Sequence, residues 1–120
     1  MSDQKRVLII EDEKPLAHAL ALKLGHEGLE AVTASNGQTG LDILANQTFD
    51  VVLLDLMMPV MDGFQVLEAL QKLEQHPAVF VLSNLSQRED EQRVLSLGAT
   101  KYFIKSNTPL SVIVEEVKKV

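Results

Sequence analysis

Carboxylates follow two separate apolar runs of the chain. Glu11 and Asp12 come directly after residues 7–10. Asp55 comes directly after residues 51–54. Carboxylates that share one crevice repel each other and raise one another's pKa values unless a cation joins them. An all-oxygen acidic site suits a hard divalent ion, and Mg²⁺ uses few carboxylates and leaves room for a phosphate oxygen. These residues therefore indicate a magnesium site.

A hydroxyl and an ammonium group follow two further apolar stretches. Ser83 comes after residues 79–82, and Lys105 comes after a weaker stretch at 102–104. We expect both at the rim opposite the carboxylates, where they complete the groups that phosphoryl transfer uses for positioning and charge neutralisation. Taken alone, an acidic run is usually a solvated turn and a lone Lys is usually surface. Their coincidence at the ends of separate strands favours a site.

The apolar runs before these residues have the character of buried strands. Residues 7–10, 51–54 and 79–82 are continuously apolar and rich in β-branched side chains, which is typical of strands buried on both faces of a parallel sheet. Two weaker strands are expected near residues 30–34 and 102–104.

Four segments between and after the strands have apolar residues at helical spacing. They are residues 16–24, 41–45, 66–73 and 110–117. The last helix is expected to have Thr108 as its N-cap and Pro109 as its first residue. Ser86 and Glu89 have capping-box spacing, which predicts another helix, the fourth in chain order, that starts at Ser86.

Five strands that alternate with five helices predict the α/β class, with a doubly wound five-stranded parallel sheet, because right-handed crossovers place helices on both of its faces. In the strand order 2-1-3-4-5, the first and third strands are neighbours, so Glu11, Asp12 and Asp55 converge. Ligands of such sheets bind at the carboxyl ends of the strands, where the winding reverses. We expect a single domain, residues 1–120, with its site at this edge.

Composition narrows the functions that this domain can have. Hydrophobic residues make up 46% and charged residues 23%, as in globular proteins, and the absence of Cys excludes disulfides and thiolate chemistry. The formal net charge of −6 disfavours direct binding to nucleic acid or to an anionic membrane. The N-terminus lacks a signal-peptide pattern, and no apolar run approaches the ~20 residues of a membrane span. We therefore expect a cytoplasmic protein.

Four ordered motifs identify a resemblance that covers essentially the whole chain. They are VLIIEDE at 7–13, VVLLDLMMPVMDG at 51–63, VLSN at 81–84 and GATKYFIK at 98–105. The second is highly specific, with Asp55 four residues before Pro59 and eight before Gly63. The chain resembles the receiver domain of two-component response regulators. The resemblance implies a flavodoxin-like fold, a phosphoacceptor role and Mg²⁺ as the cofactor.

The same resemblance implies a role for each residue of the metal site. Asp55 is the phosphoacceptor, and Asp12 and Asp55 bind Mg²⁺ through their carboxylates. Glu11 supports the ion through water, and Met57 supplies a backbone carbonyl. The phosphoryl donor is a histidine of a sensor kinase or of a phosphotransfer protein. The chain is then a phosphoacceptor that assists its own phosphorylation and dephosphorylation, and it is not classed as an enzyme.

The resemblance also implies a switch that responds to phosphorylation. Ser83 and Lys105 would contact phosphoryl oxygens, and Tyr102 would change its rotamer when Ser83 moves. Residues 87–93, at the start of the fourth helix, contain no apolar residue, so little packing energy should hold that segment in place. We expect the face formed by the fourth helix, fifth strand and fifth helix to bind a downstream output protein or domain, or a second copy of the chain.

The sequence departs from the family pattern in three places. Asn84 stands where a small residue is common and is expected to modulate access to the phosphoryl group. Ser106 replaces the usual Pro after Lys105, so this peptide bond is predicted to be trans, because a non-proline cis bond costs about 2.5–4 kcal/mol. Lys101 stands where many members have an acid, so the dimerisation charge pattern of one transcription-factor subfamily is not evident.

Two other functions compete with phosphoacceptance. One is a receiver-like interaction module that signals without phosphorylation, against which the complete set of pocket residues argues. The other is a true enzyme, either a flavin carrier or an aspartate-nucleophile phosphatase. The chain has no glycine-rich phosphate loop, and its first strand ends in Glu11-Asp12 where the phosphatase would need a D-x-D motif.

Overall fold

The computed structural model describes residues 4–84 and 88–120. Its centre is a parallel sheet whose five strands are β1 Arg6–Ile10, β2 Glu30–Ala34, β3 Val51–Asp55, β4 Ala78–Ser83 and β5 Lys101–Ile104. Their order across the sheet is β2-β1-β3-β4-β5, as predicted. Ile10 pairs with Leu54, so the residues that follow β1 lie level with Asp55 at the end of β3.

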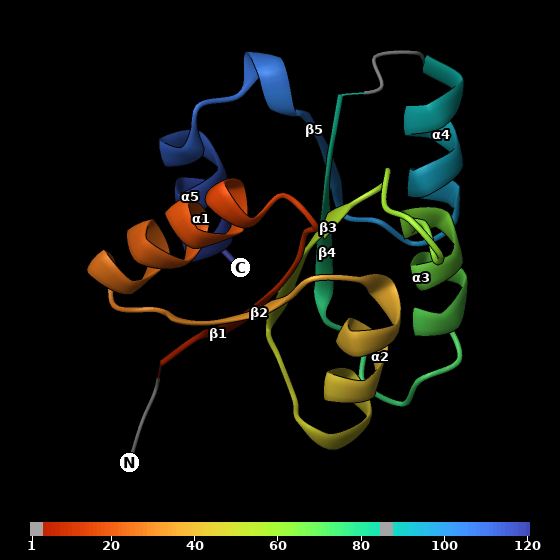
Figure 1. Cartoon of the computed structure of the whole chain (residues 1–120), viewed down its shortest axis with the longest axis horizontal. Helices are drawn as coiled ribbons and strands as arrows, with labels where there is room; N and C mark the ends of the chain where they lie inside the picture. Colours follow the sequence, from red (N-terminus) through yellow and green to blue (C-terminus); the bar gives the residue numbers. More distant parts are fainter. Residues whose placement is uncertain (1–3, 85–87) are drawn as a thin grey trace.

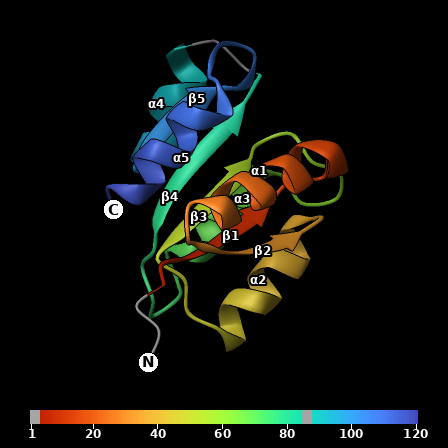
Figure 2. The ribbon, with the colours of Figure 1, turned by 90° about the vertical axis from the view of Figure 1, so that its left-hand side faces the viewer.

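Five helices and one short 3-10 turn connect and follow the strands. The helices are α1 Lys14–His26, α2 Gly37–Asn46, α3 Gly63–Leu70, α4 Arg88–Ser96 and α5 Leu110–Lys118, and the 3-10 turn is Lys105–Asn107. Helices α1 and α5 lie together on one side of the sheet, and α2, α3 and α4 lie on the other (Figure 1; Figure 2). The predicted doubly wound architecture is therefore confirmed.

The apolar strands feed two cores, one on each face of the sheet. Alternate residues of β1 illustrate the division: Leu8 packs in the core under α2, α3 and α4, whereas Ile9 packs in the core under α1 and α5. Because both faces are covered, every residue of β3 from Val51 to Leu54 is fully buried. This explains why the central strands are continuously apolar instead of alternating with polar residues.

Two predicted helix starts need comment. Helix α5 begins at Leu110 with Pro109 as its N-cap, so the prediction of Thr108 as the cap was wrong by one residue. The reason is that the Thr108 hydroxyl donates to the carbonyl of Ile104 at 2.9 Å, across the preceding 3-10 turn, and does not cap α5. The predicted start of the fourth helix, Ser86, lies outside the described residues.

Helix α3 begins with a capping box that was not predicted from the sequence. Asp62 accepts a hydrogen bond from the Gln65 amide, and the Gln65 side chain accepts one from the Asp62 amide, both at 2.9 Å. The next residue, Gly63, lies so close to β3 that an added Cβ would be 2.6 Å from the Asp55 carbonyl oxygen. The start of α3 is therefore fixed directly against the end of β3.

The loop between β3 and α3 contains a strained residue. Val60 has φ of 70°, in the left-handed region, and its side chain is almost fully exposed. This conformation is rare for a β-branched residue because its Cβ crowds the backbone. The strain lies five residues after Asp55, in the loop that borders the predicted site.

No helix within the described part of the chain is both long enough and apolar enough to cross a membrane.

Candidate functional site

Most of the predicted site residues lie at the carboxyl ends of the strands, because these ends share one edge of a parallel sheet. A cleft of about 260 Å³ lies there, lined by Asp12, Glu13, Asp55, Met57, Asn84 and Lys105. Asn84 is exposed at its wall, and its place beside a phosphoryl group stays a prediction. Chain segments that are far apart in sequence therefore build one polar cleft.

Three carboxylates form a compact acidic cluster beside this cleft. Glu11, Asp12 and Asp55 can each offer one oxygen, and these atoms all lie within 4.8 Å of one another. Glu11 and Asp55 are buried, with 2% and 3% of their surface exposed, and Asp12 is more accessible to solvent. The convergence predicted from strand order is therefore confirmed for all three acids.

Lys105 is the cation that offsets the negative charge of this cluster. Its Nζ lies 2.8 Å from Glu11 Oε1, 2.8 Å from Glu13 Oε2 and 3.4 Å from Asp55 Oδ1. The side chain of Lys105 is only 12% exposed. Glu13 was not predicted as a site residue. The only signal for it in the sequence was its place in the acidic run, which is also typical of a solvated turn.

The pKa values of Asp55 and Lys105 are both raised, but the causes differ. Burial, followed by the negative charge of Glu11, raises the pKa of Asp55 to about 7, although Lys105 opposes the shift. Burial lowers the pKa of Lys105, but its contacts with Glu11, Glu13 and Asp55 outweigh that effect, so the pKa is raised. Lys105 therefore stays charged, whereas Asp55 ionises only against a substantial cost.

The residues fit a divalent cation of the magnesium type. Apart from its ion pair with Lys105, the buried Glu11 Oε1 has no hydrogen-bond partner among the described residues. Asp55 Oδ1 accepts a long hydrogen bond of 3.2 Å from the Met57 amide and lies 3.4 Å from Lys105 Nζ, so both contacts are weak. Oxygen donors that are close together, mostly buried and incompletely satisfied are the donor set that Mg²⁺ prefers.

Ser83 and Tyr102 are not among the residues that line the cleft. Ser83 is fully buried, so the expectation of a hydroxyl at the rim was wrong in this structure. The reason is that Ser83 is the last residue of β4, between β3 and β5, and its side chain forms a hydrogen bond with Tyr102. Burial raises the pKa of Tyr102, and the Ser83 contact partly opposes this shift. The two predicted switch residues are thus in direct contact.

The peptide bond after Lys105 is trans, as predicted, since the described residues contain no cis peptide bond. Lys105 reaches the carboxylates from the first position of the 3-10 turn Lys105–Asn107. The substitution of Ser106 for the usual Pro therefore does not prevent the ammonium from entering the acidic cluster.

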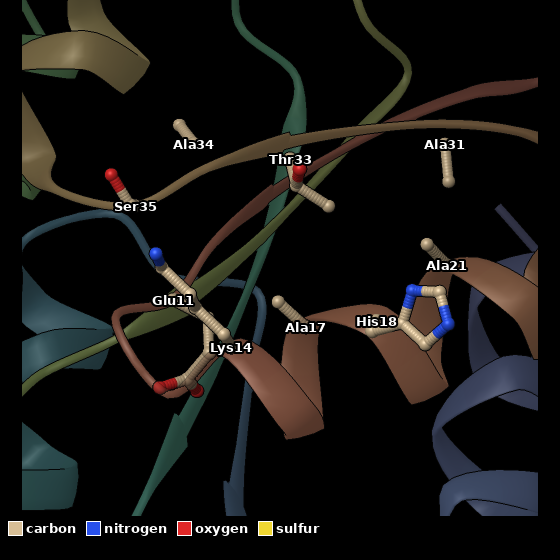
Figure 3. A pocket seen from close by; sticks show the side chains of 9 residues that line it. All are labelled: Glu11, Lys14, Ala17, His18, Ala21, Ala31, Thr33, Ala34 and Ser35. Atoms are coloured by element: carbon tan, nitrogen blue, oxygen red, sulfur yellow. The ribbon is translucent and has the colours of Figure 1, made fainter.

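A second hollow of about 370 Å³ lies on the other side of Glu11, between α1 and β2. Its walls carry small residues and the polar side chains of Lys14, His18, Thr33 and Ser35. Figure 3 shows the Glu11 carboxylate pointing away from the residues of β2. Glu11 therefore borders this hollow, while its carboxylate is paired with Lys105 of the acidic site.

Comparison with protein-family models and curated proteins gives a consistent result. The model described as the response regulator receiver domain matches residues 7–118. An uncharacterized transcriptional regulatory protein of Bacillus subtilis, YkoG, is 35% identical over 86% of this chain. The cell cycle response regulator CtrA of Brucella ovis is 35% identical over 83% of the chain. The chain spans 45% and 43% of the length of these two relatives.

Solved structures agree with this result along the whole chain. The Francisella response regulator 1452 receiver domain has a TM-score of 0.91 and 27% identity, with 97% of this chain and 95% of that chain covered. The response regulator TrrA of Thermotoga maritima, solved in complex with Mg²⁺-BeF, has a TM-score of 0.84 and 29% identity, with 97% and 98% coverage.

Proposed function

The chain belongs to the response regulator receiver domain family, and from this premise we propose that Asp55 accepts a phosphoryl group in a Mg²⁺-dependent reaction. The donor is a histidine of a sensor kinase or of a phosphotransfer protein. The observation that carries this proposal is the cluster of Glu11, Asp12 and Asp55 within 4.8 Å of one another, around the Lys105 ammonium. It supplies a nucleophile, a cation site and a fixed positive charge in one cleft.

The transfer exchanges one bond to phosphorus for another. An Asp55 carboxylate oxygen attacks the phosphorus in line, the P–N bond to the donor histidine breaks, and its electron pair returns to the imidazole. Glu11, Asp12, Asp55 and the Met57 carbonyl would hold Mg²⁺, which neutralises charge on the phosphoryl oxygens when bound. Lys105, 3.4 Å from Asp55, is already close enough to stabilise the same oxygens.

Water then reverses the modification. Attack of a water molecule on the phosphorus breaks the bond to the Asp55 oxygen and releases inorganic phosphate. Asn84 lines the cleft through which that water must approach, so its side chain modulates the rate of this step. The domain acts as a phosphoacceptor that takes part in its own reactions, and in this sense it is not a conventional enzyme.

Phosphorylation switches binding at the face formed by α4, β5 and α5. Ser83 must give up its contact with Tyr102 to donate to a phosphoryl oxygen, which frees the Tyr102 ring to adopt another rotamer. The partner is a downstream output protein or domain, or a second copy of the chain. At a net charge of −6, direct binding of this domain to nucleic acid is disfavoured.

The experiment that tests this function is phosphorylation of the isolated chain by acetyl phosphate, followed by intact mass. We expect one added phosphoryl group when Mg²⁺ is present and none when the metal is chelated. Absence of labelling under both conditions would favour the alternative function, a receiver-like interaction module that signals without phosphorylation.

A further inference from the structure

Glu13 touches the proposed phosphoryl site although none of the roles above requires it. Its Oε2 lies 2.8 Å from Lys105 Nζ, as close as the buried Glu11 carboxylate. The two acids differ in environment, since the Glu13 side chain is 58% exposed and that of Glu11 is 1% exposed. Lys105 is thus shared between a permanent buried partner and an exposed one.

The position of Glu13 in α1 makes this contact unusual. Glu13 is the N-cap residue of α1, where a Ser, Thr, Asp or Asn side chain normally accepts a hydrogen bond from the first turn. The Glu13 side chain makes no such bond and reaches Lys105 instead. Its amide donates to Glu11 Oε2 at 3.1 Å, and its carbonyl accepts from the Ala17 amide at 3.0 Å. These two contacts hold the backbone of Glu13 in a position from which its side chain reaches the Lys105 ammonium.

A phosphoryl group on Asp55 would compete for the same ammonium. A lysine ammonium has three donors, and in this structure three carboxylates lie within ion-pair distance of it. Because Glu11 is buried, loss of its ion pair would leave a charge in the interior that only Mg²⁺ could compensate. Glu13 can turn into solvent and be rehydrated at little cost. Among these three carboxylates, Glu13 is the one that can release the Lys105 N–H group that it accepts from, so that this group donates to a phosphoryl oxygen instead.

We propose that Glu13 is a positioning residue, a displaceable counter-ion that holds Lys105 in the unphosphorylated site and releases it to the phosphoryl group. This inference rests on the proposed function. Its consequence is that the Glu13 ion pair favours the unphosphorylated state. Loss of the pair should therefore strengthen binding of a phosphoryl group or its mimic.

The test compares wild type, Glu13→Gln and Glu13→Asp by calorimetric titration with beryllofluoride at saturating Mg²⁺. Glu13→Gln removes the charge and leaves only a neutral amide oxygen to accept a hydrogen bond from Lys105. Glu13→Asp keeps the charge and shortens the side chain, so that it no longer reaches Lys105. We expect both variants to bind beryllofluoride about threefold more tightly, the size expected for an ion pair with one exposed partner. Affinity for Mg²⁺ alone should not increase in either variant.

The control is Glu27→Gln, which breaks an exposed ion pair with Lys118 away from the site and should leave beryllofluoride affinity unchanged. A gain in Glu13→Gln without a gain in Glu13→Asp would show a long-range charge effect and overturn the inference. Unchanged or weaker binding in both variants would also overturn it. If wild type itself fails to bind beryllofluoride with Mg²⁺, the proposed function and the inference both fail. If wild type binds and the Glu13 variants show no gain, only the inference fails.

Discussion

Asp55 carries its carboxylate in surroundings that resist its ionisation. Burial and the Glu11 charge raise its pKa from an ordinary 3.8 to about 7, even though Lys105 lies 3.4 Å away. An anion held in this way is destabilising until a cation or a covalent modification changes the balance of charge. The buried carboxylate therefore costs stability unless a cation offsets its charge.

We predict that Asp55→Asn stabilises the fold in the absence of Mg²⁺. Because the folded pKa is above 3.8, the folded state binds the proton more tightly than the unfolded state does, and the free energy of unfolding falls as the pH rises from about 4 to 7. Asn cannot ionise, so it avoids this loss. The gain over wild type should be on the order of a few kcal/mol at pH 8, since one pKa unit corresponds to about 1.4 kcal/mol.

Urea denaturation of both proteins across this pH range measures the effect. The gain of Asp55→Asn should shrink steadily as the pH falls from 7 towards 4. A gain that is constant with pH would show that Asp55 ionisation is not its source.

The second prediction concerns Mg²⁺ and Asp12. Binding to the folded state alone raises the free energy of unfolding, by about 1.4 kcal/mol at ten times the dissociation constant. Wild type should therefore melt at a higher temperature when Mg²⁺ is added, and Asp12→Asn should lose most of this shift. Asp42→Asn, a change to an exposed acid in α2, is the matched control and should keep it. An equal shift in all three proteins would place the ion elsewhere.

At the scale of single elements, the β3–α3 connection positions the acceptor. Gly63 is in contact with the end of β3, where an added Cβ would also lie 2.7 Å from the Leu56 Cα. Backbone atoms cannot move aside as a flexible side chain can. The start of α3 and the carboxylate of Asp55 must therefore shift together if this residue gains a side chain.

We predict that Gly63→Ala destabilises the protein by about 1–3 kcal/mol, the usual cost of overpacking, and weakens beryllofluoride binding. Gly25→Ala is the control, because its Cβ would have no atom within 4 Å and it lies inside α1. It should raise stability by roughly 0.5–1 kcal/mol through helix propensity. Urea denaturation of the two variants in parallel measures these changes. An equal loss in the free energy of unfolding for both would show that the close contact of Gly63 is not the cause.

A second element-scale prediction follows from the strain at Val60. Val60→Gly should stabilise the fold by about 1 kcal/mol, because Gly adopts a φ of 70° without steric cost. Val60→Ala retains the Cβ and should give little of this gain. Equal melting temperatures for wild type and Val60→Gly would show that the loop stores no strain.

Helix α4 is the element best suited to respond to the site. Its first turn holds Glu89, Asp90 and Glu91, and among its described residues Val94 is the buried apolar one. Arg93 adds a cation–π contact, with its guanidinium 3.9 Å from the centroid of the Phe64 ring of α3. With so little packing, a small difference in contacts should suffice to shift the position of this helix.

We predict that a bound phosphoryl mimic changes the environment of α4 and β5 as well as the cleft. Amide NMR shifts with Mg²⁺ and beryllofluoride should move at residues 88–97 and at Tyr102. The changes outside the cleft should diminish in Ser83→Ala, because Ser83 contacts Tyr102 and is proposed to contact the phosphoryl group. Changes confined to the cleft of wild type would exclude this route.

At the scale of the whole molecule, the strand order makes the site. Because β1 and β3 are neighbours, the carboxylates after them converge, and Lys105 arrives from the far edge of the sheet across β4. These features could be predicted from sequence, since fully apolar strands and helical spacing define a parallel α/β sheet and its topology defines the functional edge.

Other features depended on contacts that sequence spacing does not reveal. The Glu13–Lys105 pair joins residues 92 positions apart. The local sequence around Glu13 is the same whether its side chain pairs with Lys105 or is solvated at the surface. Thr108 looked like a cap because its alternative partner, the Ile104 carbonyl, exists only after the 3-10 turn has formed. Ser83 was expected at the rim, but the side on which a strand-end residue is buried depends on its neighbours in the sheet.

Phosphorylation of Asp55 is the step on which the proposed function depends. To locate it, the chain is treated with acetyl phosphate and Mg²⁺, the acyl phosphate is reduced with borohydride, and the modified residue is identified by peptide mass spectrometry. We expect conversion of Asp55 alone, and no modification in Asp55→Ala. Modification of another residue in wild type, or undiminished labelling of Asp55→Ala, would show that Asp55 is not the phosphoacceptor.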